Sequence, residues 1–343
     1  MAYASEDAFR AGLKARLVRE ARDSRFSRDE LARAFTLHLF TARLFRSSDA
    51  KHWILTGGTA LQFRAPQQAR PTADADLATR LDAEHMQESL QRAARPGPGD
   101  FGHFDIRISP TDNPGLFAGH IRYIVAGQRF SDASLDLATH REMLFAAEET
   151  VPEPALRVDE LDPMPVIRMQ AVAEAIADKV AALYELHGPQ GQTPSTRVHD
   201  LVDLAILTGT QRVDAAQLHT ALRYQEQRRA ITIPVPLVLP SPSWQRDYPD
   251  RAAHSGVPRE LGTAERALAY TNTLIEPVLS GRVTSGQWDP GTGAWAPPTR
   301  SIADLLADTR SPQRAHTPTP PATTSPTPQP YSTDRARDTE RGL

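Results

Sequence analysis

The sequence predicts an α+β protein of the mixed α/β type, with a mixed sheet in its N-terminal half and a mostly helical C-terminal half. Three observations favour this class. Short apolar runs, some with period-two alternation, lie between residues 50 and 140. A glycine pair directly follows one of these runs and opens a helical pattern. Beyond residue 165, apolar residues recur at three- and four-residue spacing over long stretches.

The elements of the N-terminal half follow from these patterns. Helices are expected over residues 6–22, 28–45 and 83–94, and the second carries apolar residues on two faces, which predicts burial on both sides. Strands are expected at residues 53–55, 75–78, 104–109, 120–125 and 134–139. The Gly57-Gly58 pair predicts a turn before a helix at 59–64, Ala126-Gly127-Gln128 predicts a turn between strands, and the run 95–99 ends a helix.

The C-terminal half is predicted to be mainly helical. Helices are expected over residues 166–186, 195–207, 214–229 and 263–279, with a turn at His187-Gly188-Pro189. Six prolines between residues 232 and 258 predict an extended connector, and residues 286–296 predict a small hairpin. Residues 311–343 are rich in Pro and Thr and poor in large apolar residues, which predicts disorder. We therefore expect domains at 1–150 and 151–310, followed by a disordered tail at 311–343.

Composition excludes several kinds of chemistry. The chain of 343 residues has no cysteine, which excludes disulfides, thiolate nucleophiles and Cys-ligated zinc. Its eleven histidines show no spacing typical of a zinc site. The N-terminus lacks the apolar core of a signal peptide, and no stretch approaches the roughly 20 apolar residues of a membrane span. We expect a cytoplasmic protein without a membrane partner. Its net charge of -3 predicts no global attraction to nucleic acid.

The most informative stretch is Thr56-Gly57-Gly58-Thr59-Ala60-Leu61. Glycines after a strand let backbone N–H groups approach a phosphate closely, and a helix N-terminus adds partial positive charge. The Thr59 hydroxyl is a suitable donor to a phosphate oxygen. This segment predicts one wall of a site for a nucleoside triphosphate (NTP).

A pair of aspartates follows, in Arg70-Pro71-Thr72-Ala73-Asp74-Ala75-Asp76-Leu77. Because residues two apart on a strand project from the same face, Asp74 and Asp76 are placed to hold Mg²⁺ or Mn²⁺ together. Two-metal phosphoryl transfer normally uses a third carboxylate, for which Asp136 is the candidate. Either motif alone is common in turns and on solvated strands, whereas their combination within about 20 residues is much more specific.

These two segments resemble the AbiEii/AbiGii-type nucleotidyltransferase toxins of the DNA polymerase beta-like superfamily. The family has Gly-Gly-[Ser/Thr]-Ala-Leu before Arg-x-[Ser/Thr]-x-Asp-[Ile/Val]-Asp-Leu, and this chain departs only in having Ala75. The resemblance implies a nucleotidyltransferase-like core, Mg²⁺ or Mn²⁺ as cofactor and an NTP as substrate. It also implies nucleotide binding by a set of residues in and near the motifs: Gly57, Gly58, Thr59, Arg70, Thr72 and Lys179.

The helical half carries a second match to this family, in Ala177-Asp178-Lys179-Val180-Ala181-Ala182-Leu183 and Arg197-Val198-His199-Asp200-Leu201-Val202-Asp203-Leu204. His199 stands where the family has Lys, which removes a fixed charge. The resemblance implies that Lys179 reaches the triphosphate and that Asp200 acts as a base or an orienting carboxylate for the acceptor. The alternative is that Lys179 and Asp203 are exposed helix charges, and that Arg197, Asp200 and Asp203 cap or pair at i, i+3 spacing.

The resemblance further implies a toxin of a bacterial toxin-antitoxin or abortive-infection system, with a separate antitoxin protein as partner. Its acceptor is expected to be RNA, in particular tRNA. A small molecule or a protein hydroxyl remains an alternative acceptor, and a non-catalytic protein that binds nucleotide or a partner is an alternative function. Arg64 and Arg70 flank the expected site as phosphate contacts or solvated charges, and Arg223, Arg228 and Arg229 form an RNA contact or a polar helix face.

Overall fold

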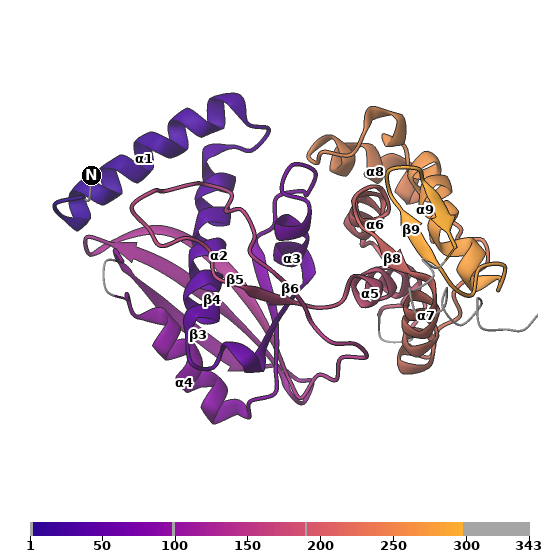
Figure 1. Cartoon of the computed structure of the whole chain (residues 1–343), viewed down its shortest axis with the longest axis horizontal. Helices are drawn as coiled ribbons and strands as arrows, with labels where there is room; N and C mark the ends of the chain where they lie inside the picture. Colours follow the sequence, from indigo (N-terminus) through magenta and orange to yellow (C-terminus); the bar gives the residue numbers. More distant parts are fainter. Residues whose placement is uncertain (1–2, 98–99, 189–190, 298–343) are drawn as a thin grey trace, which may run out of the picture. The chain divides into compact units, whose positions relative to one another are not determined.

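The structure is a computed structural model that describes residues 3–97, 100–188 and 191–297. Figure 1 shows two N-terminal helices, then a large sheet, then a group of helices. The helices are α1 (Glu6–Asp23), α2 (Arg28–Arg46), α3 (Gly57–Arg64), α4 (Ala83–Ala94), α5 (Val172–Tyr184), α6 (Val198–Thr210), α7 (Ala215–Arg229), α8 (Ser243–Ala253) and α9 (Ala264–Leu279), with short 3₁₀ turns η1 (Ala50–His52) and η2 (Arg259–Leu261). The strands are β1 (Trp53–Thr56), β2 (Asp74–Thr79), β3 (His103–Pro110), β4 (Leu116–Val125), β5 (Gln128–Thr139), β6 (Glu148–Thr150), β7 (Ile167–Met169), β8 (Val213–Asp214), β9 (Gln287–Asp289) and β10 (Ala294–Ala296).

The large sheet has seven strands in the order β3-β4-β5-β2-β1-β7-β6. Strand β2 pairs parallel with β5 and antiparallel with β1, so the sheet is mixed, as predicted. Strands β4 and β5 form a hairpin in which Ala126 and Gly127 have φ values of 52° and 65°. Two successive left-handed residues are typical of a type I′ turn, which confirms the turn expected at Ala126-Gly127-Gln128.

Helix α2 packs against β5 of this sheet (Figure 1). Its N-terminus has a capping box, in which Glu30 N donates to Ser27 Oγ at 3.3 Å and Ser27 N donates to Glu30 Oε2 at 2.8 Å. Every residue from Ala34 to Phe45 is buried, because α1 and α4 pack against the same helix. The prediction of a helix covered on two sides is confirmed.

Buried apolar side chains gather into two hydrophobic cores. One core lies among α1, α2, α4 and the large sheet, and includes Trp53 and Leu135. The other lies among the helices from α5 to α9, includes Trp244 and Trp288, and also takes in Leu61 of α3. Helix α3, which begins with the glycine pair, therefore contributes to the helical core. The domain division at 1–150 and 151–310 stays a prediction.

The helix expected over residues 166–186 begins later than predicted. Ile167 and Met169 lie in strand β7, where Met169 is the register partner of Leu55 in β1, and α5 starts at Val172. Both side chains are buried while Arg168 between them is half-buried, which is the alternation of a strand. A three-residue strand next to a long helix is too short for periodicity to separate the two.

The extended connector expected over residues 232–258 is also partly wrong, because it contains helix α8. Trp244, Tyr248 and Ala252 recur at four-residue spacing and are buried in the helical core. Trp244 Nε1 donates to Ser195 O at 3.0 Å, which satisfies its buried polar group. The hairpin expected at 286–296 is present as β9 and β10, and β8 adds a third strand. Two short strands, β6 and β8, were not predicted.

The predicted tail at 311–343 and parts of two predicted breakers, Pro98-Gly99 and Pro189, lie outside the described residues. Within the described ranges, no helix combines the length and the apolar character that crossing a membrane requires.

Candidate active site

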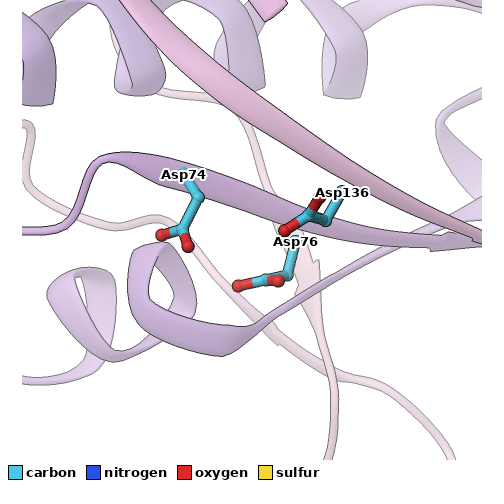
Figure 2. Close-up of side chains that lie close together, drawn as sticks. All are labelled: Asp74, Asp76 and Asp136. Carbon is cyan, nitrogen blue, oxygen red and sulfur yellow. The ribbon is translucent and has the colours of Figure 1, made fainter. Parts of the chain in front are cut away.

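Three aspartates meet on two neighbouring strands. Asp74 and Asp76 lie two residues apart on β2, and the parallel strand β5 places Asp136 in register with Asp76. Carboxylate oxygens of the three residues lie within 4.8 Å of one another. Figure 2 shows them turned toward a common space from the two strands. The structure thus brings together the three residues that the sequence selected as metal ligands, which we call the acidic triad.

Burial and mutual repulsion raise the pKa values of two members of the acidic triad, Asp76 and Asp136. Burial, together with the charges of Asp74 and Asp136, raises the pKa of Asp76 to about 6. Burial and the charge of Asp74 also raise the pKa of Asp136. Clustered carboxylates of this kind are stabilised by a hard divalent cation with oxygen ligands, so the donor set fits Mg²⁺ or Mn²⁺.

The glycine pair makes room for the acidic triad. Gly57 has φ of 64°, and a Cβ atom there would lie 1.7 Å from Asp76 Oδ2. A Cβ atom on Gly58 would lie 2.6 Å from Thr72 Oγ1. Both glycines belong to the first turn of α3 rather than to a separate turn before it. In the structure they let β2 and its carboxylate approach the start of this helix, which is a different close contact from the phosphate contact expected from the sequence.

Two threonines hold Asp74 in place. Thr59 is fully buried and its hydroxyl donates to Asp74 O at 2.7 Å. Thr72 is also buried, and its hydroxyl donates to the Asp74 carboxylate. In this structure the Thr59 hydroxyl is enclosed and already has an acceptor, and its contact with a phosphate stays a prediction. Both hydroxyls position β2 and Asp74.

A second set of charged residues links the two halves of the site, and we call it the ion-pair network. Lys179 Nζ on α5 donates to Asp200 Oδ1 at 3.2 Å and to Asp203 Oδ2 at 2.6 Å, both on α6. Arg70, which precedes β2, donates from Nε and Nη2 to the two oxygens of Asp203 at 3.0 and 3.1 Å. Arg197 Nε donates to Asp200 Oδ2 at 2.7 Å.

Alternating charge fixes the ionised state of this network. Although burial alone would lower the pKa of Lys179, the carboxylates of Asp203 and Asp200 raise it above its usual value. Burial opposes ionisation of Asp200 as well, but Lys179 and Arg197 lower its pKa. Burial also lowers the pKa of His199, so the replacement of the family's Lys removes a fixed charge here.

The bidentate Arg70 contact ties the segment before β2 to α6. Arg70 was expected to contact the nucleotide, whereas here both of its donating edges are committed to Asp203, which is fully buried. Arg64 is committed in a similar way, since its Nη2 lies 2.6 Å from Glu148 Oε2. Both arginines therefore hold the framework of the site together.

A pocket connects the acidic triad with the ion-pair network, and its wall is rich in cations. Asp76, Gly57, Lys179 and Asp200 all line it. The charged side chains of its wall are the cations Arg64, Arg141, Lys179, Arg197, Arg228 and Arg229 and the carboxylates Asp76, Asp178 and Asp200. This excess of positive charge, next to a metal-binding set of carboxylates, suits a polyanion such as a triphosphate.

The group around Asp178 on this wall was not predicted from the sequence. Arg228 and Arg229 were expected to form either an RNA contact or a polar helix face, but both line the pocket and lie near Asp178, whereas Arg223 is not one of its lining residues and pairs with Glu226 at 2.7 Å. The available signal was the position of Asp178 next to Lys179 in the second motif. Nothing in the sequence indicates that Arg141 reaches the same carboxylate.

Four features together define the nucleotidyltransferase class of protein core. They are the mixed sheet, the three clustered aspartates, the glycine pair at the start of the adjoining helix and the cationic pocket. The family comparison agrees with this class, since the model described as "Nucleotidyl transferase AbiEii toxin, Type IV TA system" matches residues 38–269. The chain belongs to this family of type IV toxin-antitoxin nucleotidyltransferases, and membership implies a nucleotide substrate and an antitoxin partner.

Among solved structures, the chain is similar to the nucleotidyltransferase toxin MenT4 from Mycobacterium tuberculosis H37Rv. The two are 16% identical, with a TM-score of 0.47, and the match covers 78% of this chain and 88% of that one. A comparison with proteins of curated function gives no match.

Proposed function

We propose that this protein transfers a nucleoside monophosphate from an NTP to an RNA acceptor, specifically tRNA, with Mg²⁺ or Mn²⁺ as cofactor. The observation that carries the proposal is the position of the acidic triad at one edge of a pocket whose wall has excess positive charge. Family membership supports the transferase activity. We further propose that the protein acts in the cytoplasm, in a toxin-antitoxin or abortive-infection response.

The acidic triad is the proposed metal site. Asp74, Asp76 and Asp136 supply the oxygen ligands, and Thr72 keeps the Asp74 carboxylate oriented. A divalent cation bound there supplies charge neutralisation at the phosphates and activation of the acceptor hydroxyl. Gly57 and Gly58 hold the start of α3 against this site, where the backbone of α3 favours negative charge.

The ion-pair network is proposed to position the nucleotide. Lys179 lines the pocket and faces the phosphates as a point charge, in agreement with the role implied by the family resemblance. Asp200 was expected to act as a base or as an orienting carboxylate. Because two cations lower its pKa and bind its oxygens, it is a poor proton acceptor, and we propose the orienting role. Asp203 has the same role for Arg70 and Lys179.

The test is incubation of the purified protein with each α-³²P-labelled NTP, Mg²⁺ and total bacterial RNA, followed by a denaturing gel. Label on tRNA-sized bands is expected, and it should disappear in the Asp74→Ala, Asp76→Ala variant. A matched control is Asp105→Asn, which removes a carboxylate from strand β3 of the same sheet and should leave labelling unchanged.

Other outcomes of this experiment select between the alternatives. Label on protein or on a small product would show that this molecule, and not RNA, is the acceptor. No label with any NTP, together with binding of nucleotide, would favour a binding protein without turnover and would contradict the proposal.

A further inference from the structure

One partly buried carboxylate gathers side chains from three separate segments of the chain. Asp178 Oδ2 accepts from Gln170 Nε2 at 2.8 Å and from Arg141 Nη2, and its Oδ1 accepts from Gln225 Nε2 at 2.8 Å and from Arg229 Nη2 at 3.2 Å. Arg228 Nη2 lies 3.7 Å from Oδ1. Gln170 precedes α5, Arg141 follows β5, and the other donors lie on α7. We call these residues the Asp178 cluster.

The arginines of this cluster differ in how many of their N–H donors are left to bind a ligand. Arg229 is fully used, since it also donates to Gln225 Oε1 at 3.1 Å and to Glu185 Oε2 at 2.8 Å. Arg141 and Arg228 share the Asp178 carboxylate, and the Arg228 side chain is 42% exposed and too far from Asp178 for a hydrogen bond. Both line the pocket, so they present N–H donors to it.

The part of the pocket wall formed by the Asp178 cluster suits a phosphate group better than a nucleotide base. Both Asp178 oxygens accept hydrogen bonds within the cluster, and the Gln225 amide uses both its donor and its acceptor side there. Arg141 and Arg228 therefore offer the pocket positively charged N–H donors and no acceptor. The edge of a base presents donors and acceptors together, whereas phosphate oxygens only accept, and arginine is well suited to bind them.

The other cations of the pocket lie closer to carboxylates than the 3.7 Å that separates Arg228 from Asp178. Lys179 and Arg197 pair with Asp200, and Arg64 pairs with Glu148. Since Asp178 is shared by several guanidinium groups, Arg141 and Arg228 carry the least compensated positive charge on the wall. A ligand with several negative charges at one end is attracted most strongly to this part of the pocket.

We propose that Arg141 and Arg228, held by Asp178, bind the β- and γ-phosphates of the NTP and thereby the pyrophosphate that leaves. This inference rests on the proposed function. The acceptor oxygen forms a bond to the α-phosphorus while the bond from that phosphorus to the α,β-bridging oxygen breaks. The electron pair stays on pyrophosphate, which the two arginines neutralise, and the acceptor hydroxyl loses its proton to solvent. Asp178 is a positioning residue in this scheme.

The test is calorimetric binding of three probes: pyrophosphate, the α,β-methylene analogue of each NTP, which cannot be cleaved at the reacting bond, and each NMP. In Arg228→Ala we expect affinity for pyrophosphate and the NTP analogue to fall on the order of tenfold to a hundredfold, and affinity for NMP to stay unchanged. Arg228→Lys should recover part of the loss. The matched control is Arg223→Ala, which removes a similarly exposed arginine from the same helix outside the pocket and should change no affinity.

Arg141→Gln is the second variant, and it should show the same selective loss. Thermal melting of each variant excludes misfolding as the cause. An equal loss for NMP and the NTP analogue, or no loss in either variant, would overturn the inference. If the wild type binds pyrophosphate through these arginines but transfers no nucleotide, the phosphate subsite stands and the proposed function fails.

Discussion

The acidic triad reaches the pocket through Asp76 and the ion-pair network reaches it through Lys179, Arg197 and Asp200, but the two clusters are built in opposite ways. The acidic triad sets three carboxylates within 4.8 Å of one another, and the pKa of Asp76 rises to about 6. The ion-pair network alternates cations and anions, so that Asp200 has a lowered pKa and Lys179 a raised one. The acidic triad is therefore destabilised by repulsion among its own charges, whereas each charge of the ion-pair network has a partner of opposite sign.

This difference separates a cluster whose charges need a ligand to compensate them from a cluster whose charges compensate one another, even though Lys179 of the second cluster also lines the pocket. A cluster of like charges is retained at a stability cost where a cation or a charged substrate compensates it. A buried alternating network needs no ligand, but removal of one member leaves an uncompensated charge. The two clusters should consequently respond to neutralising mutations with opposite sign.

The largest expected effect is on the ion-pair network. Lys179→Met leaves Asp200 and Asp203 buried beside each other with one cation fewer, which should lower the free energy of unfolding by about 3–5 kcal/mol. Urea unfolding followed by circular dichroism measures this loss. The control is Lys14→Met, an exposed lysine on α1, which should change stability by less than about 0.5 kcal/mol. A loss no larger than that of the control would show that the network is not structural.

The acidic triad should respond in the other direction. Asp76→Asn removes repulsion and the burial penalty, so at pH 7.5 in EDTA it should raise the free energy of unfolding by about 2–3 kcal/mol. The same variant should lose nucleotide transfer. Asp136→Asn, at a more exposed position, should give a smaller stability gain. Destabilisation by Asp76→Asn would remove the distinction between the two clusters.

A bound divalent cation should cancel the stability advantage of Asp76→Asn over the wild type. Mn²⁺ at a hundred times its dissociation constant is expected to stabilise the wild type by about 2.7 kcal/mol, because it binds only the folded triad. The Asp76→Asn variant should show little shift in its melting temperature under the same titration. Equal shifts in the two proteins would place the metal elsewhere.

The smallest effect is a pH dependence with a defined sign. Since the folded pKa of Asp76, about 6, lies above its unfolded value, folding takes up a proton between these two values. The penalty is complete above pH 6 and is relieved as pH falls toward 4, so the stability difference between Asp76→Asn and wild type should shrink. Buried His38, with a pKa lowered to about 4, destabilises both proteins equally as pH falls below 6.5, and it cancels in this difference. A difference that stays constant between pH 7.5 and pH 4.5 would contradict the raised pKa of Asp76.

The sequence predicted the elements that carry strong periodicity, and it predicted the residues that make up the acidic triad. Asp74 and Asp76 follow from the two-residue repeat of a strand, but the register that sets Asp136 beside Asp76 is a property of sheet pairing. Helix α8 was missed because the prolines around it outweighed the spacing of Trp244 and Tyr248. Strand β7 was missed because three residues are too few to show a period.

Contacts between distant segments were beyond prediction for a different reason. The groups that accept hydrogen bonds from Thr59 and Arg70 lie 15 and 133 residues away in the sequence, and no local pattern encodes these pairings. The Asp178 cluster is the extreme case, because its donors come from before α5, after β5 and α7. Sequence patterns indicate which residue types are present, whereas tertiary packing decides which carboxylate each arginine meets.

The bidentate contact between Arg70 and Asp203 also has a consequence for how the toxin is made. A ribosome synthesises Arg70 133 residues before Asp203, and at about 5–20 residues per second that stretch takes roughly 7–27 s to translate. Through most of that interval the growing polypeptide has Asp74 and Asp76 but lacks Asp203 and the arginines of α7. The order of the elements along the chain thus delays assembly of the complete pocket until α7 has been translated, when about two thirds of the protein exists.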